Sequence, residues 1–240
     1  MFIVNNKTKG IISILILLLL SCNKQDNIND DYLSALGKGD LDAVENFILQ
    51  GVAIDTIFNN GSTPIHIAIE KGNKKLVELL INKGADVNSK DIVGWTPLHK
   101  TAKLNEYDIA ELLINESADV NSPGINGWTP LLRAIGFAHV EMVALLLENG
   151  ADINVYNKPQ EWGPLHWTAW AGVGRAKKNN STLPIAKILV KAGVDPFADS
   201  NSGGGMGGRG GKTPLELAKH FGNRDEENYL LSLKDTKNEK

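Results

Sequence analysis

The stretch that most looks like a chemical site is GGGMGGRGGKTPLELA at 203–218. Its Gly-Lys-Thr triplet at 211–213 matches the end of a phosphate-binding loop, in which backbone N–H groups and a lysine hold the phosphates of a nucleotide. Such a loop also needs a glycine six positions before the lysine, where this chain has Met206, and a buried strand before the loop. The segment at 187–194 has the apolar spacing of a helix instead. We therefore predict that the chain binds no nucleotide.

The histidines are the next candidate, because imidazole is a common zinc ligand. His66, His99 and His166 each lie two residues after a proline that recurs along the chain. Equivalent residues of neighbouring helical repeats lie about 8–10 Å apart, whereas zinc needs its nitrogen ligands at about 2.0–2.1 Å. His139 and His220 have no partner at a ligand spacing. We predict structural histidines and neither a metal site nor another cofactor.

No catalytic constellation is present in the sequence. There is no G-x-S-x-G motif, and carboxylate pairs such as Asp225 and Glu227 fit a solvated loop or helix start. The formal net charge of −3 and the lack of a basic stripe argue against a nucleic-acid partner. We predict that the protein is not an enzyme.

The single cysteine, Cys22, closes an N-terminal leader. Two lysines precede an apolar run of ten residues at 11–20, which is the length of a signal-peptide core and half of the roughly 20 residues that cross a membrane. The run ends in LLSC at 19–22, which resembles the lipobox of bacterial lipoproteins, although Leu20 is bulkier than the usual occupant. The alternative is an ordinary cleaved signal peptide with an incidental cysteine.

The lipobox resemblance implies removal of 1–21 and lipid attachment to Cys22. It also implies a location in the bacterial cell envelope, anchored to a membrane at its periplasmic face or on the cell surface. The polar residues 22–29 would form a short tether between the anchor and the fold.

An internal repeat determines the elements that must position any site. Its prolines recur at intervals of 33, 33, 34 and 50 residues, at Pro64, Pro97, Pro130, Pro164 and Pro214. A threonine or an equivalent residue before each proline is typical of a helix start, and Thr213 with Glu216 forms a capping-box pattern. Small residues eight positions after four of the prolines predict the end of a short first helix: Gly72, Ala138, Gly172 and Gly222. A second helix follows in each unit, and three glycines predict its end: Gly84, Gly150 and Gly193.

The motifs TPIH, TPLH and GADVN resemble those of the ankyrin repeat from residue 30 to about 233. The resemblance implies an all-α solenoid, in which each unit has two antiparallel helices and a projecting hairpin-like loop. The expected units are an N-terminal cap, four repeats, a C-terminal cap and a polar tail, at 30–60, 61–93, 94–126, 127–160, 161–210, 211–233 and 234–240 respectively.

The fourth repeat contains 17 extra residues. The second-helix pattern comes nine residues late, which places one insert between the helices in VGRAKKNNSTLP and the other eight residues in the loop DSNSGGGMGGRG. Inserts in repeat proteins map to loops and either have a function or are simply tolerated.

The ankyrin resemblance also implies a protein-binding surface. Three tryptophans lie two residues before a repeat proline, at the hairpin end: Trp95, Trp128 and Trp162. The position after the TPLH histidine lines the concave side in that family, and here it includes Lys100, Arg133 and Trp167, with Trp170 one turn further on. Aromatic residues beside arginine are the usual composition of an interface hot spot.

We therefore expect a monomer that binds or inhibits a partner protein, such as an envelope enzyme or a toxin. Three alternatives remain open. The tryptophans could stack on one another and only stiffen the loops, the protein could be a structural spacer, or Trp167 and Trp170 could bind a small molecule or a cell-wall fragment.

Overall fold

The computed structural model describes residues 28–59, 61–158, 160–174, 182–200 and 211–238. The expected leader, Cys22 and most of both inserts lie outside these ranges. The described residues form helices and loops without a strand, as the all-α expectation requires. No helix among them is both long and apolar enough to cross a membrane. The chain divides into two compact units, 1–85 and 86–240.

The first unit contains four helices in its described part. They are a helix at 28–38, α2 (Leu41–Leu49), α3 (Pro64–Glu70) and α4 (Lys74–Asn82). The first of them is already helical at 28, two residues before the start expected at 30. The buried ring of Tyr32 lies 5.8 Å from the rings of both Phe47 and Phe58 and forms the centre of this cap. α4 packs on both α2 and α3.

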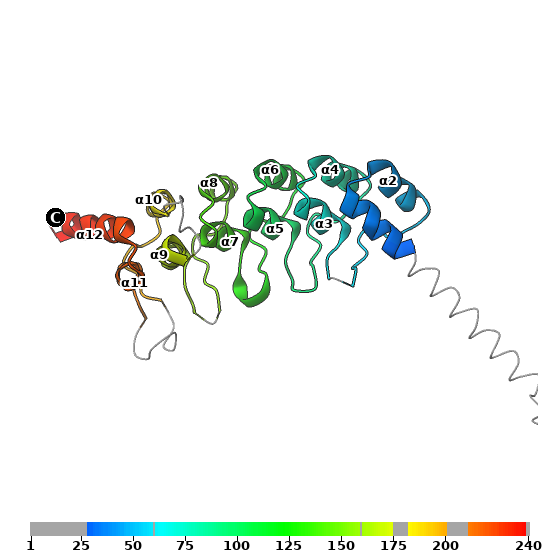
Figure 1. Ribbon diagram of the computed structural model, residues 1–240. Coiled ribbons are helices and arrows are strands. Elements are labelled where there is room, and N and C mark those ends of the chain that lie inside the picture. Colours follow the sequence, from blue (N-terminus) through cyan, green and yellow to red (C-terminus); the bar gives the residue numbers. More distant parts are fainter. Residues whose placement is uncertain (1–27, 60, 159, 175–181, 201–210, 239–240) are drawn as a thin grey trace, which may run out of the picture. The chain divides into compact units, whose positions relative to one another are not determined.

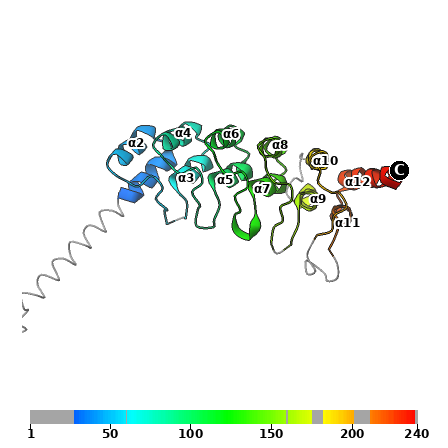
Figure 2. The same ribbon diagram turned by 180° about the vertical axis from the view of Figure 1, so that it is seen from behind.

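The described part of the second unit contains four helix pairs, which Figure 1 shows side by side. Their bounds are α5 (Pro97–Leu104), α6 (Tyr107–Asn115), α7 (Pro130–Gly136), α8 (Val140–Glu148), α9 (Pro164–Gly174), α10 (Leu183–Lys191), α11 (Pro214–Phe221) and α12 (Arg224–Asn238). We call α5, α7 and α9 the inner layer and α6, α8 and α10 the outer layer. The loops project beyond the inner layer, as the view from behind also shows (Figure 2).

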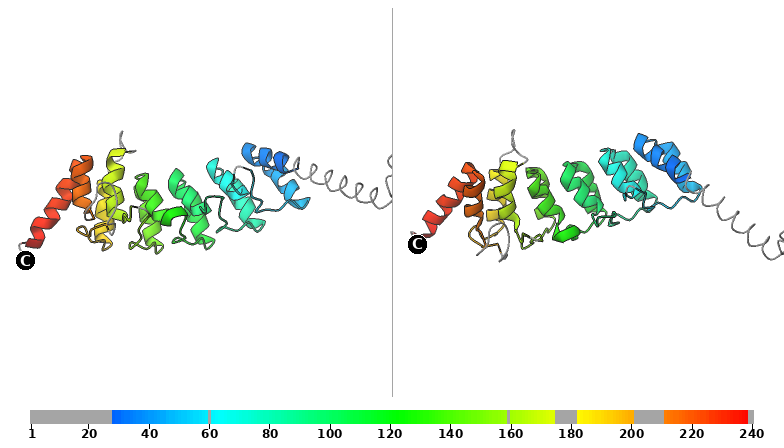
Figure 3. Two further views of the ribbon diagram at one scale, coloured as in Figure 1. Left: turned by 90° about the horizontal axis from the view of Figure 1, so that it is seen from below. Right: turned by 60° about the horizontal axis from the view of Figure 1, so that its bottom comes forward.

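Packing within this unit follows the order of the repeats. α7 contacts α5 on one side and α9 on the other, and α9 contacts α11. The inner helices accordingly lie beside one another when the molecule is turned (Figure 3). Each helix is too short to be stable alone, so contact between neighbouring repeats supplies the apolar burial that the fold requires.

The predicted helix starts are confirmed. The repeat prolines stand in the first turn of their helices, where no backbone donor is lost. The Thr213 hydroxyl accepts from the Glu216 N–H at 3.2 Å, and the Glu216 carboxylate accepts from the Thr213 N–H at 2.9 Å. This capping box shows that the Gly-Lys-Thr triplet serves as the start of α11.

The predicted ends of the first helices are confirmed in three repeats and wrong in one. Gly72, Ala138 and Gly222 have φ values of 62°, 59° and 74°, the left-handed conformation that ends a helix. Asn105, which the sequence pattern did not single out, takes this role at φ 63°. Gly172 does not, because α9 continues to Gly174.

The insert lies between the helices, as predicted. α8 begins ten residues after Pro130, whereas α10 begins nineteen residues after Pro164. Gly150 and Gly193 end the second helices at φ 84° and 101°, as expected. α12 extends to Asn238, five residues past the boundary at 233.

Asparagine side chains connect consecutive repeats. Asn88 Oδ1 accepts from the Asp119 N–H at 2.8 Å, and its Nδ2 donates to the Ser117 carbonyl at 3.3 Å. Asn121, one repeat later, makes the same pair of bonds to Asp152 and Gly150 at 2.7 and 3.0 Å. These repeated bonds fix the register between the loops that carry the candidate site.

A buried carboxyl group holds α12 against α9 and α10. Glu226 is fully buried and contacts Thr168 Oγ1 at 2.5 Å, Thr182 Oγ1 at 3.3 Å and Asn223 Nδ2 at 2.9 Å. Burial raises the pKa of Glu226 from 4.5 to about 7, and the three polar neighbours counteract part of that rise.

Candidate protein-binding surface

The loops of the second unit are closed by short backbone bonds that place each tryptophan. The Asp91 N–H donates to the Trp95 carbonyl at 2.9 Å, and the Gly124 N–H donates to the Trp128 carbonyl at 2.7 Å. The Asp91 carboxylate also accepts from the Trp95 N–H at 2.8 Å. Gly124 is needed here, because a Cβ atom would lie 2.9 Å from the Trp95 ring and 3.2 Å from the Trp128 carbonyl.

Arg133 lies between two of the predicted tryptophans. Its guanidinium carbon is 3.7 Å from the ring centroid of Trp95 and 5.3 Å from that of Trp128. Lys103 Nζ lies 5.6 Å from the same Trp95 ring. Such cation–π contacts each contribute about 0.5–2 kcal/mol, and they also fix the direction of the guanidinium.

Trp167 is the centre of an aromatic cluster. Its ring lies 4.5 Å from that of Trp128, 5.1 Å from that of Trp162 and 5.3 Å from that of Trp170. The Trp162 ring in turn lies 6.2 Å from Phe221. Consecutive repeats are therefore joined by ring contacts, which is the arrangement expected if the tryptophans stiffen the loops.

Only 6% of the Trp167 side chain is exposed, so this residue lies beneath the surface and supports it. Its Nε1 donates to Asn157 Oδ1 at 2.9 Å, and Asn157 Nδ2 donates to Gln160 Oε1 at 2.7 Å. The other residues expected to touch a partner are half-buried and offer only part of their side chains: Trp95, Lys100, Trp128, Arg133, Trp162 and Trp170.

The most exposed apolar side chains of this region lie at the loop tips or, for Tyr156, just before the backbone bond that closes the loop, and the sequence-based prediction missed them. Ile92 is 74% exposed, Val93 43%, Ile125 50% and Tyr156 42%. We call these four the tip residues. Ile92 and Ile125 occupy the same place in their repeats, five residues before the repeat proline. The sequence feature that could have indicated these exposed residues is an isoleucine in a polar, glycine-containing loop.

His99 and His166 make the local hydrogen bonds expected of structural histidines. His99 Nδ1 accepts from the Thr96 N–H at 3.2 Å, and its Nε2 donates to the Trp128 carbonyl at 2.9 Å. His166 Nε2 makes the equivalent bond to the Lys212 carbonyl at 3.0 Å. Burial lowers the pKa of both imidazoles to about 4, so both are neutral near pH 7. No group of three potential metal ligands occurs among the residues that the structure describes.

The chain matches the family "Ankyrin repeats (3 copies)" over residues 1–91, 32–124, 90–157 and 117–199. Because these matches cover well over half of its length, the protein belongs to the ankyrin-repeat family. Ankyrin repeats generally mediate contacts between proteins, and they are typically not enzymes. No curated protein matches the sequence as a relative.

Proposed function

We propose that this protein is a non-enzymatic binding module that holds one partner protein on the tip residues and the half-buried side chains of the inner layer. The exposure of four large apolar side chains on successive loops supports this proposal most directly. Contiguous exposed apolar surface is characteristic of interaction sites. The aromatic cluster beneath the tips holds the loops in place, so binding costs less conformational entropy.

The sequence pattern at 19–22 supports a place for this module in a bacterial cell envelope, with the lipid on Cys22. An envelope enzyme or a toxin would then be the partner class. A lipid anchor would leave the repeats free to present their loops to such a protein.

The binding proposal is tested by replacing three tip residues together with serine, as I92S/I125S/Y156S. We expect partner capture by the full chain, measured by cross-linking and affinity purification from envelope extract, to fall at least tenfold. The midpoint of urea unfolding should change little, because exposed side chains contribute little to stability.

The matched control is Leu49→Ser, which removes another side chain that is 74% exposed, in the first unit. This variant should capture the partner normally. Undiminished capture by the triple variant would contradict the proposal and favour a spacer whose tryptophans only stiffen it. The tryptophans themselves are poor test positions, because removing them also removes packing.

A further inference from the structure

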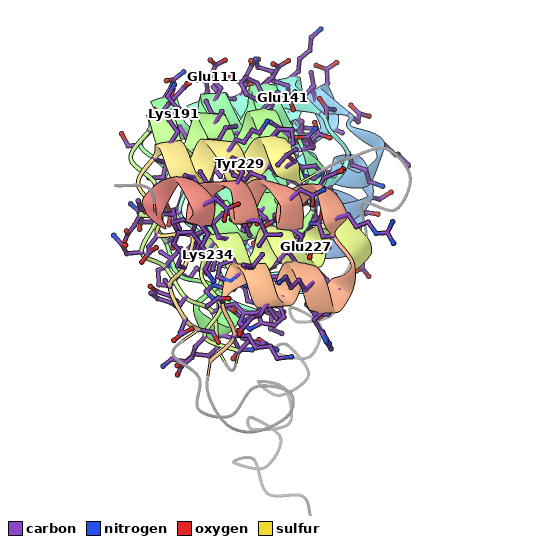
Figure 4. The ribbon with its side chains drawn as sticks, turned by 90° about the vertical axis from the view of Figure 1, so that its left-hand side faces the viewer. Glu111, Glu141, Lys191, Glu227, Tyr229 and Lys234 are labelled. Carbon is purple, nitrogen blue, oxygen red and sulfur yellow. The ribbon has the colours of Figure 1, made fainter. Side chains whose placement is uncertain are left out.

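In the second unit the inner layer is positive and the outer helices α6 and α8 are negative, whereas the outer helix α10 carries Lys187 and Lys191. The described helices of the inner layer contain Lys100, Lys103 and Arg133 and no aspartate or glutamate. In the outer layer, α6 and α8 contain only acidic charges: Asp108, Glu111, Glu141 and Glu148. Figure 4 shows Glu111 and Glu141 at the outer edge of the helices. The layer beside the proposed binding surface is therefore positive.

Two of the three inner cations, Lys103 and Arg133, lie over an aromatic ring. Arg133 stacks on Trp95 at 3.7 Å, and Lys103 lies over the same ring at 5.6 Å. Lys100 occupies the repeat position that corresponds to Arg133 and is half-buried. A guanidinium stacked on a ring by its face keeps its N–H groups at its rim, where they can donate to a carboxylate in a fixed geometry.

We propose that the partner segment bound here is acidic, with carboxylates that meet Lys100, Lys103 and Arg133 and apolar side chains that meet the tip residues. This inference rests on the proposed function and specifies the chemistry of its partner. Charge complementarity supports it, because a basic segment would meet the like charges of Lys100, Lys103 and Arg133, and like charges oppose association.

The test is a selection of random 12-residue peptides on the immobilised full chain. We expect the enriched peptides to contain more aspartate and glutamate than lysine and arginine, together with large apolar residues. Their affinity should fall at least fivefold between 50 and 300 mM NaCl, since salt screens exposed charges. The variant K100E/K103E should reverse the charge preference. Arg133 is left unchanged because it also supports two tryptophans.

The matched control reverses the charge of the outer layer instead, as E111K/E141K, and should leave the acidic preference unchanged. Enriched peptides without an acidic excess, or an acidic preference that survives K100E/K103E, would overturn the inference. If such peptides still lose binding to I92S/I125S/Y156S, the proposed function stands and only the charge inference fails. If no peptide is enriched, or if none depends on the tip residues, both fail.

Discussion

Single residues show how this surface combines packing with exposure. Trp167 and Tyr156 are both large aromatic residues, of the fourth and third repeats respectively, yet the first is 6% exposed and the second 42%. The Trp167 side chain touches three tryptophan rings and donates a hydrogen bond to Asn157. The two positions should therefore respond to substitution in opposite ways.

Trp167→Ala should lower the free energy of unfolding by about 3–5 kcal/mol, because it leaves a cavity and an unpaired Asn157 oxygen. Urea denaturation followed by circular dichroism measures this loss. Tyr156→Ala is the matched control and should stay within about 0.5 kcal/mol of the parent protein while weakening partner capture. Equal stability of both variants would show that the tryptophan cluster does not hold the loops.

At the scale of elements, Glu226 determines how firmly α12 is held. The Thr168 hydroxyl lies 2.8 Å from the Leu165 carbonyl and 2.5 Å from Glu226 Oε1, but it has only one hydrogen to donate. When that hydrogen goes to the carbonyl, a protonated Glu226 supplies the second bond. The other titratable or charged side chains on α9, α10 and the first turns of α12 are His166, Lys187, Lys191, Arg224, Asp225, Glu227 and Tyr229. None of them contributes to the shift in the pKa of Glu226.

Because the pKa of Glu226 is about 7 in the folded protein and near 4.5 when unfolded, the folded state binds this proton more tightly. Its stabilising effect is complete below pH 4.5 and is lost as the pH rises through 7. Glu226→Gln keeps a donor for Thr168 without a charge. At pH 8.5 the free energy of unfolding of this variant should therefore be about 3 kcal/mol higher than that of the parent protein.

At pH 4.5 the stabilities of the variant and the parent should converge. Comparing them at the same pH cancels the contribution of the histidines, whose lowered pKa values make the fold less stable as the pH falls below 6.5. Glu227→Gln, on the same helix (Figure 4), is the control and should not show this dependence. A stability difference between E226Q and the parent that does not change with pH would contradict the assignment.

At the scale of the whole molecule, the question is where the ankyrin repeats act. The proposed lipid on Cys22 would hold the protein at a membrane. Lipoproteins carry two or more acyl chains, and two chains anchor stably where one binds only marginally.

Cys22→Ala should therefore abolish labelling by a fatty-acid analogue and move the protein from the membrane fraction to the soluble fraction. Immunoblotting of the two fractions measures the change. Ser21→Ala, which keeps a small residue before the cysteine, should remain labelled and membrane-bound. Continued membrane association of the Cys22 variant would rule out the anchor and favour an ordinary leader with an incidental cysteine.

Most of the fold could be predicted from the sequence, because its signals are local. The bond between Thr213 and Glu216 spans three residues, and the left-handed turn at Gly222 depends on its own backbone freedom. At Gly172 the local signal failed, because α9 continues past this glycine to Gly174.

The tryptophans and basic residues of the candidate site were predictable, whereas its exposed apolar side chains were not. The repeat register placed Trp95, Trp128 and Trp162 correctly at the loop ends, and it placed Lys100 and Arg133 on the inner layer. Only the tertiary structure decided that Trp167 lies beneath the surface, that Ile92 and Ile125 are its exposed apolar groups, and that Glu226 is buried. The physical reason is that burial depends on contacts with residues of other repeats, about 30 or more positions away, whereas helix starts and ends depend on neighbours within about four residues.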